Sequence, residues 1–165
     1  PVPEDFTSHY DRKEQGLVVD YIIIMGYDEH FAGGAAGSVA SLSYVENGIT
    51  DTLEEVPKEK LINSVPLYTR VWTEKDGKTT SKAYGITAAQ NWVEENNVEL
   101  TWQDNIGQYY GETENENGTQ KIWMEETKSL GLKKDLVNKY DLAGIACWKL
   151  GFETADIWAV INDVK

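Results

Sequence analysis

The stretch that decides the fold reads LVVDYIIIMGYDEH and occupies residues 17–30. Its first nine residues are almost continuously apolar, which is the pattern of a strand buried on both faces in a parallel sheet. Polar residues begin after Gly26, and a Gly/Ala-rich segment at 32–37 predicts a loop. The sequence therefore predicts a buried strand over 17–25 whose carboxyl end carries the residues that follow Gly26.

Helical and strand-like segments alternate on both sides of the insertion described below. Ser41 or Ser43 can cap the first helix, Thr154 can cap the last, and Pro66 argues for the end of a strand. The predicted helices cover 42–56, 127–140 and 155–164, the last with Val164 on its apolar face, and the predicted strands cover 61–68 and 142–148. This alternation is typical of an α/β fold with parallel strands joined by crossover helices.

The segment 71–124 interrupts the alternation. It contains a polar, turn-rich stretch, and Thr87 to Gln90 have the pattern of a capping box that opens a short helix. The remaining features are a short strand at 100–102 and a hairpin formed by 108–113 and 120–124, with Asn117-Gly118 in its loop. We therefore expect a small α+β insertion at 71–124 between an α/β unit at 1–70 and a helix–strand–helix unit at 125–165.

Length and charge exclude several classes of protein. The chain has 165 residues, whereas a complete (β/α)8 barrel typically needs ~250. Its net charge of −13 repels phosphate backbones, so we expect neither a nucleic acid partner nor insertion into a membrane. The single cysteine, Cys147, lies in an apolar run and is expected to be an inert thiol, and no metal-ligand spacing is present.

Residues with side chains suited to binding a ligand stand where the predicted strands end. These are Tyr27 and Asp28, then Tyr68 and Arg70, then Trp148. In parallel α/β folds the carboxyl ends of the strands form the site, so these five would face one mouth. Hydrogen-bonding groups beside a flat aromatic platform suit a polyhydroxylated sugar ring. Each residue also has a structural interpretation, because tyrosines and Trp148 can fill a core and Asp28 and Arg70 can serve a turn or an ion pair.

Four segments carry a resemblance to a known family. Met25-Gly26-Tyr27-Asp28 matches the Met-x-Tyr-Asp motif of glycoside hydrolase family 18, which includes chitinases and N-acetylglucosaminidases of bacterial cell walls and spore cortex. The other segments are VPLYTR at 65–70, similar to the seventh-strand motif, residues 123–130, similar to the entry to the seventh helix, and residues 142–151, similar to the eighth strand. Their order implies the C-terminal portion, about three β/α units, of a TIM barrel.

The resemblance implies a role for each candidate site residue. Tyr27 would hydrogen-bond the N-acetyl group of the substrate, and Asp28 would position the substrate and the catalytic acid. Tyr68 and Arg70 would line the cleft, Trp148 would form the floor beneath the distorted sugar, and Met25 would lie beneath the site. Ser64 and Leu67 stand where the family more usually has Gly and Phe, a change that affects packing.

The catalytic signature of the family, Asp-x-x-Asp-x-Asp-x-Glu, does not occur in the sequence. The family uses substrate-assisted catalysis, in which the acetamido oxygen of the substrate attacks the anomeric carbon and a Glu protonates the leaving oxygen. We expect the chain to start after the fifth strand and to lack this acid. Glu29 follows Asp28 but is not assigned the role. Acid pairs at 54–55 and 125–126 are expected on solvated helix faces, with Glu126 close enough to the cleft to deserve a check.

Three functions remain open from the sequence: a fragment of a glycosidase, a lectin-like glycan-binding module, or a structural domain with an eroded cleft. The first implies hydrolysis of β-1,4 links next to N-acetylglucosamine in peptidoglycan or a chitin-like glycan, without a cofactor, at the cell wall, at the spore or outside the cell. Three strands of a barrel leave two open edges. We therefore expect the chain to associate with the N-terminal barrel part or with itself.

Overall fold

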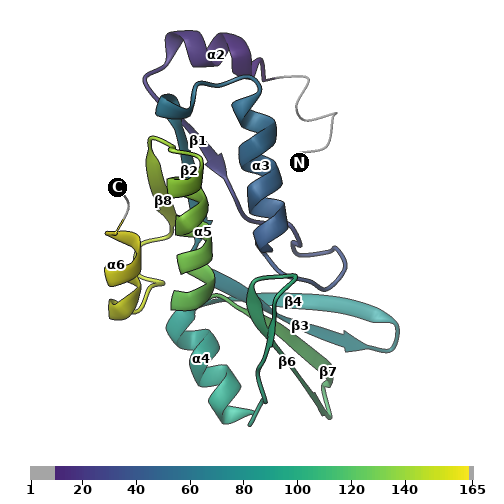
Figure 1. The fold of residues 1–165 in the computed structure, drawn as a ribbon. Helices are drawn as coiled ribbons and strands as arrows, with labels where there is room; N and C mark the ends of the chain where they lie inside the picture. Colours follow the sequence, from purple (N-terminus) through teal and green to yellow (C-terminus); the bar gives the residue numbers. More distant parts are fainter. Residues whose placement is uncertain (1–9, 164–165) are drawn as a thin grey trace.

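The computed structural model of the chain describes residues 10–163, which form two sheets and their covering helices (Figure 1). The first sheet is parallel, with the order β1-β2-β8. Its strands are β1 (Ile22–Met25), β2 (Leu61–Pro66) and β8 (Gly144–Trp148). Ile22 is paired with Leu61 and Pro66 with Trp148, so the carboxyl ends of all three strands lie at one edge. The prediction of parallel strands is confirmed.

The predicted strand over 17–25 is too long. Helix α2 (Arg12–Val18) takes its first two residues, and only β1 remains extended. Asp11 caps α2 by accepting from the backbone N–H of Glu14 at 3.0 Å. Lys60 Nζ then donates to backbone carbonyls at the other end of this helix, at 2.8 and 2.9 Å. These capping contacts favour a helix where apolar composition alone favoured a strand.

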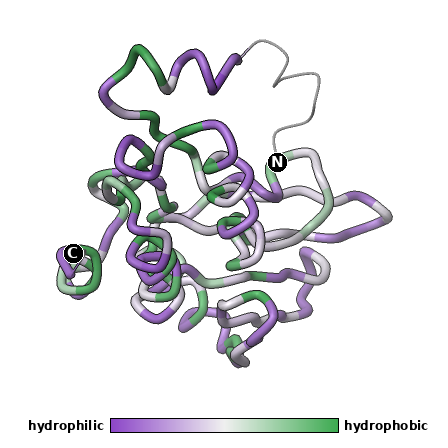
Figure 2. Tube along the Cα trace, turned by 45° about the horizontal axis from the view of Figure 1, so that its top comes forward, coloured by the Kyte–Doolittle hydropathy of each residue, from purple (hydrophilic) through white to green (hydrophobic). Residues whose placement is uncertain are grey.

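Helices α3 (Leu42–Leu53) and α5 (Thr127–Lys139) cover one face of the parallel sheet, side by side (Figure 1). Both were predicted, and Ser41 caps α3 as expected, accepting from the N–H of Tyr44 at 3.3 Å. Apolar residues of both helices pack on β1 and β2, and the helical traces alternate between hydrophilic and hydrophobic colours (Figure 2). This alternation is what an amphipathic surface helix requires.

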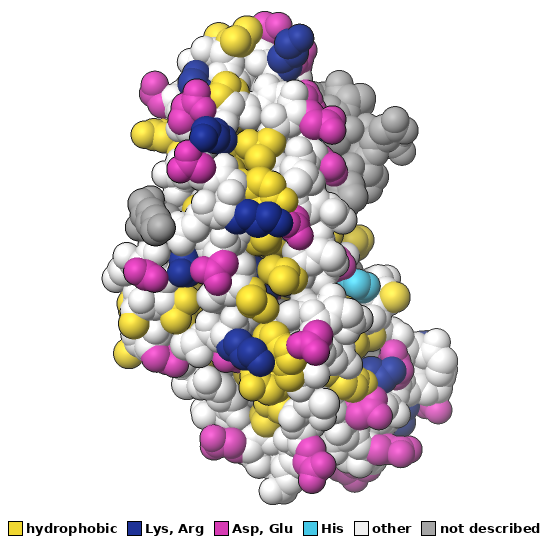
Figure 3. Space-filling view, viewed as in Figure 1, with side chains coloured by type: hydrophobic (Ala, Val, Ile, Leu, Met, Phe, Trp, Pro, Cys, Tyr) yellow, Lys and Arg dark blue, Asp and Glu magenta, His cyan; other side chains and the backbone are white. Residues whose placement is uncertain are grey.

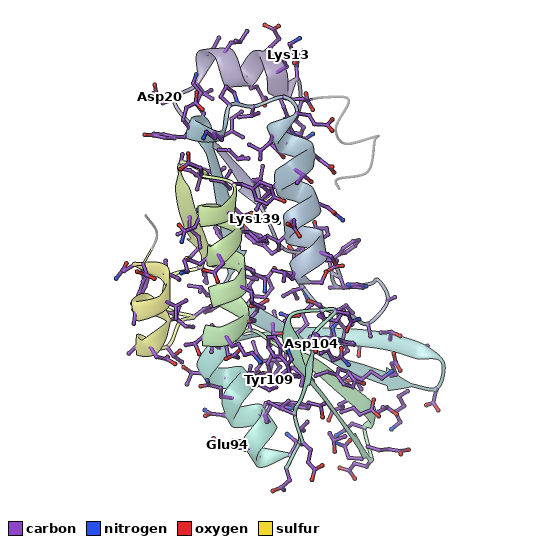
Figure 4. All side chains as sticks on the ribbon, viewed as in Figure 1. Lys13, Asp20, Glu94, Asp104, Tyr109 and Lys139 are labelled. Carbon is purple, nitrogen blue, oxygen red and sulfur yellow. The ribbon has the colours of Figure 1, made fainter. Side chains whose placement is uncertain are left out.

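Ion pairs and hydrogen bonds join the two helices at the surface. Lys139 of α5 reaches toward α3 (Figure 4), where its Nζ donates to Glu46 at 2.6 Å, and the hydroxyl of Tyr140 donates to the same carboxylate at 2.8 Å. A band of hydrophobic atoms runs down this face between the charged side chains (Figure 3). Helix α6 (Ala155–Ile161) packs against α5, and Thr154 stands at its N-cap without a side-chain hydrogen bond to it. Val164 lies outside the described residues.

The second sheet is antiparallel and has the order β4-β3-β7-β6-β5. Its strands are β3 (Tyr68–Lys75), β4 (Lys78–Gly85), β5 (Thr101–Gln103), β6 (Gln108–Asn115) and β7 (Gly118–Met124). The predicted hairpin is present as β6 and β7. The stretch expected to be turn-rich instead forms the β3–β4 ladder, in which Thr73 is paired with Thr80. Tyr68, predicted as the end of a strand, opens β3.

Helix α4 (Ile86–Glu95) covers one face of this sheet, where Trp92 packs on Val71 and Ile122. The predicted capping box at Thr87 is wrong. The N-cap is Gly85, which has no side chain to accept a hydrogen bond. Gly85 instead allows close packing, because a Cβ at this position would come within 3.1–3.2 Å of Phe152, which follows β8.

Among residues 10–163, no helix is long and apolar enough to cross a membrane. The same residues include no group of three or more His, Cys, Asp or Glu side chains that could hold a metal ion.

The reactivity of the Cys147 thiol tests how β8 is packed. Burial, and to a smaller extent the charge of Glu153, raise the pKa of its thiol to about 11 from a reference of 9.0. Thiolate is the reactive form, and its fraction near pH 8 falls about tenfold per unit of pKa. We expect a disulfide reagent to modify the folded chain about 100-fold more slowly than the urea-unfolded chain. Equal rates would contradict a half-buried Cys147.

Candidate active site

The candidate residues come from segments that leave the parallel sheet at one edge. Tyr27 and Asp28 follow the last residue of β1, and Tyr68 opens β3 two residues after β2 ends. Trp148 is the last residue of β8. Leu67, between β2 and β3, donates its N–H to the carbonyl of Trp148 at 2.7 Å, which ties the second and third segments together. The topology alone brings all of these segments to one edge.

The closest contacts within this group involve Tyr27, Asp28 and Tyr68. The hydroxyl of Tyr68 donates to Asp28 Oδ1 at 2.5 Å. The Tyr27 and Tyr68 rings meet edge to face, with centroids 6.1 Å apart. Tyr68 is buried whereas Asp28 is exposed and has a positive φ of 61°, a left-handed conformation that few residues other than Gly adopt. The turn after β1 therefore places the carboxylate of Asp28, an exposed residue, in a hydrogen bond with the hydroxyl of Tyr68, a buried one.

Burial and nearby charge keep both phenols protonated. Burial is the main cause that raises the pKa of Tyr68, and the hydrogen bond to Asp28 raises it further. Burial also raises the pKa of Tyr27, although a hydrogen bond with Ser64 partly opposes it. A phenol with a raised pKa remains a hydrogen-bond donor throughout the neutral range. The site can therefore donate to a carbonyl oxygen without changing its own charge.

Arg70 lies on the same side of β3 as Tyr68, because alternate residues of a strand share a side. Its charge acts on the Tyr68 hydroxyl, where it opposes the rise in pKa. One terminal nitrogen donates to Ser81 Oγ at 3.2 Å. Its Nε is buried and has no hydrogen-bond partner among the described residues. An unsatisfied buried donor is costly, so this guanidinium is a candidate for an oxygen-bearing ligand.

Met25 and Trp148 lie on the face of the parallel sheet that α3 and α5 leave open. Side chains alternate along a strand, and Met25 pairs with Ser64 and then Ala146, two residues before Trp148. Met25 is 70% exposed and Trp148 55% exposed. Trp148 ends β8 at the edge that Tyr27 follows, and the hydroxyl of Tyr27 is hydrogen-bonded to Ser64, which is on that face. That Trp148 and Tyr27 belong to one mouth stays a prediction.

A cavity of about 900 Å³ opens beside β1 and α3. Its lining includes Ile23, Met25, Tyr27, Asp28, Phe31 and Tyr44. Apolar walls with a few polar groups at one end are typical of ligand sites. Among residues 10–163, the wall formed by β1 is also an unpaired strand edge, so packing against another segment is an equally good use of this space.

The acidic residues near this edge have structural partners. Glu29 accepts from the N–H of Ser41 at 2.7 Å and from its hydroxyl at 3.0 Å, which fastens it to the start of α3. Glu126 is the N-cap of α5 and accepts from the N–H of Ser129 at 2.8 Å. Glu54 and Glu55 are exposed, as predicted. The prediction for Glu125 is wrong.

Glu125 is completely buried rather than solvated. It ends the insertion just before α5, where Lys133 Nζ approaches its oxygens at 2.7 and 3.0 Å. Burial raises the pKa of Glu125, and the charge of Lys133 opposes that rise. Sequence reasoning also missed Ser64 and Ser81, the partners of Tyr27 and Arg70, because a single serine in a strand carries no pattern.

Replacing Tyr68 with Phe removes only the hydroxyl that binds Asp28. A hydrogen bond of this kind contributes about 1–2 kcal/mol, so we expect the free energy of unfolding in urea to fall by about that much. The control is Tyr21→Phe, at a ring that is 60% exposed, for which little change is expected. Equal effects of the two substitutions would contradict the Tyr68–Asp28 contact.

Several known proteins are similar to the chain in sequence and in fold. The chain is 27% identical over 157 residues to the cortical fragment-lytic enzyme of Bacillus subtilis (strain 168), covering 93% of the chain and 36% of that protein. Its fold matches a chitinase from Chromobacterium violaceum ATCC 12472, with a TM-score of 0.86, 26% identity, and coverage of 93% of this chain and 48% of the other.

It also matches the spore cortex-lytic enzyme SleL of Bacillus megaterium QM B1551, with a TM-score of 0.83, 26% identity, and coverage of 94% and 36%. The chain thus spans well under half of the first curated relative that it matches. The family model described as glycosyl hydrolases family 18 matches residues 1–153. The chain therefore belongs to glycosyl hydrolases family 18.

Proposed function

We propose that this chain forms the acetamido-binding side of a glycosidase active site, as the last three β/α units of a TIM barrel. The observation that carries the proposal is the Tyr27–Asp28–Tyr68 group at the carboxyl edge of a parallel sheet. Among residues 10–163, the helices that pack on this sheet lie on one of its faces. In a barrel its bare face would be the interior, and the site would open at this edge.

The proposed substrate is a β-1,4-linked glycan that contains N-acetylglucosamine. Tyr27 donates its hydroxyl to the acetamido group and holds its oxygen toward the anomeric carbon. That oxygen forms a bond to the anomeric carbon as the glycosidic C–O bond breaks, and water later opens the cyclic intermediate with retention. Asp28 orients the acetamido group, and Tyr68 fixes Asp28 through the bond described above.

Trp148 and Arg70 serve the rest of the sugar. The exposed indole of Trp148 offers a flat surface on which a sugar ring stacks, with Met25 beneath the site. The unpartnered Nε of Arg70 suits a hydroxyl or carbonyl oxygen. The relatives named for cortical fragments and spore cortex favour peptidoglycan over chitin, and with it a location at the wall or spore.

The acidic residues near this edge that the structure describes have structural partners, so none of them is assigned as the general acid. Glu29 is fastened to Ser41, Glu125 to Lys133, and Glu126 caps α5. Protonation of the leaving oxygen contributes ~10²- to 10⁴-fold to rate, so the reaction needs a Glu from the remainder of the active site. The proposal places that Glu in the other strands of the barrel.

The 165-residue chain should therefore bind an N-acetylglucosamine tetramer without cleaving it. We expect calorimetry or NMR titration to detect weak binding, and Tyr27→Phe or Asp28→Asn to weaken it about tenfold, which is ~1.4 kcal/mol. Tyr21→Phe serves as the matched control. Absence of binding would count against the proposal, and cleavage that Glu29→Gln abolishes would show that the acid is present.

The bare face predicts association. Ile23, Met25 and Trp148 are each more than half exposed on it, and within the described part of the chain one edge of β1 is unpaired. An unpaired edge beside apolar side chains favours pairing with another chain. We expect light scattering to give a mass above that of a monomer, and Ile23→Lys to lower it. A stable monomer at high concentration would contradict this expectation.

A further inference from the structure

A buried polar network joins the insertion to the loop that carries Asp28. Glu125 and Lys133 form its base, and both side chains are at most 1% exposed. Ser129 Oγ donates to the second oxygen of Glu125 at 2.8 Å. Gln108, on β6 and fully buried, donates its Nε2 to the first oxygen. Its own Oε1 accepts from the hydroxyl of Ser38, in the loop between β1 and α3.

The chemistry of the groups fixes the direction of every bond in this network. A carboxylate only accepts, and a lysine ammonium only donates. Glu125 must therefore receive the NH₂ group of Gln108, which leaves the amide oxygen of Gln108 facing Ser38. The hydroxyl of Ser38 then donates to Gln108 and accepts from the N–H of Ala40 at 3.0 Å. Because the ion pair sets the orientation of Gln108, it also sets the position that Ser38 must take.

Ser38 in turn fixes the strand-end turn by folding the loop back on itself. Its carbonyl is bonded to His30 Nδ1 at 2.9 Å, and the carbonyl of Val39 accepts from the N–H of Glu29 at 3.0 Å. A second contact from the insertion supports this arrangement, since Trp72 Nε1 donates to the carbonyl of Gly37 at 2.8 Å. The residues that follow Asp28, Glu29 and His30, are thus hydrogen-bonded to the 37–39 segment, which in turn contacts Gln108 and Trp72 of the insertion.

Stability does not explain why an ion pair stands at this place. Removing two charges from water costs several kcal/mol, and well-packed apolar pairs are often as stable. A network with one allowed pattern of donors and acceptors specifies a single arrangement, which apolar packing does not. We propose that Gln108, oriented by the Glu125–Lys133 pair, is a positioning residue that sets the Tyr27–Asp28 turn for glycan binding. This inference rests on the proposed function.

The test replaces the pair with neutral side chains of similar shape, Glu125→Gln together with Lys133→Met. The amide at 125 no longer forces one orientation on Gln108, so the loop loses its single arrangement. We expect the indole N–H resonance of Trp72 to shift or broaden and the affinity for an N-acetylglucosamine tetramer to fall about tenfold, with urea unfolding still cooperative. A misplacement near 1 Å in a binding constellation has effects of this size or larger.

The matched control is the surface pair Lys58–Asp141, also 2.7 Å apart, which lies outside the antiparallel sheet that carries Trp72. Lys58→Met with Asp141→Asn should change neither the Trp72 resonance nor the affinity. Unchanged resonance and affinity in the Glu125/Lys133 variant would overturn the proposal. If that variant fails to fold, Ser38→Ala decides, because it removes the hydroxyl that joins the loop to Gln108 and that accepts from the N–H of Ala40, and it must reproduce the shift of Trp72.

The two readouts also separate this inference from the proposed function. If the unsubstituted chain binds no tetramer, the proposed function fails, whereas the Trp72 resonance still reports whether Gln108 positions the loop. If the chain binds the tetramer and Ser38→Ala moves the resonance without lowering affinity, the proposed function stands and the positioning role is overturned.

Discussion

Parallel pairing of three short strands is the constraint on which the rest of the structure depends. The register that sets Met25 beside Ser64 and Pro66 beside Trp148 determines which residues leave the sheet together. Neither Tyr27 nor Tyr68 belongs to the parallel sheet, yet their rings meet because the strands before them run in the same direction. A strand reversed in this sheet would send its tyrosine to the opposite edge.

The insertion has a structural task that follows from its place in the chain. It begins at Tyr68, whose hydroxyl donates to Asp28, and its last strand ends at Met124, just before Glu125. One face of its sheet packs on α4, whereas Trp72 and Gln108 reach the loop between β1 and α3. Long loops rich in Gly and Ala have little apolar surface with which to order themselves. Hydrogen bonds to the side chains of Trp72 and Gln108 give this loop the order that its own composition lacks.

Sequence patterns predicted the elements whose local and tertiary preferences agree. The helices α3 and α5 and the strands β2 and β8 follow from periodicity and apolar runs, because their burial matches their pattern. The candidate site residues were chosen because they stand at strand ends, where the structure also has them, and their roles stay predictions. The correct length of the first strand was not predictable, since Leu17 and Val18 are exposed at the end of a capped helix and their apolar character misleads.

Polar residues inside the fold escaped prediction for a different reason. Gln108 and Ser38 are common surface residue types, and only a partner distant in sequence explains their burial. Glu125 stands beside Glu126 in what reads as a solvated pair, yet the first is the buried partner of Lys133 and the second caps a helix. Adjacent residues at the start of a helix point in different directions, so charge pattern alone does not separate them.

On the open face, the position of a residue along its strand distinguishes residues expected to pack from residues expected to bind a ligand. Ile23 and Met25 project from the same side of β1 but at different levels, and Met25 is two register pairs closer to the edge where Tyr27 and Trp148 lie. The interior of a small barrel is filled by side chains, whereas its mouth receives the ligand. Under the proposed function, Ile23 lies at the level that other strands cover and Trp148 lies at the level that receives the sugar, because parallel strands order the residues of one face by level.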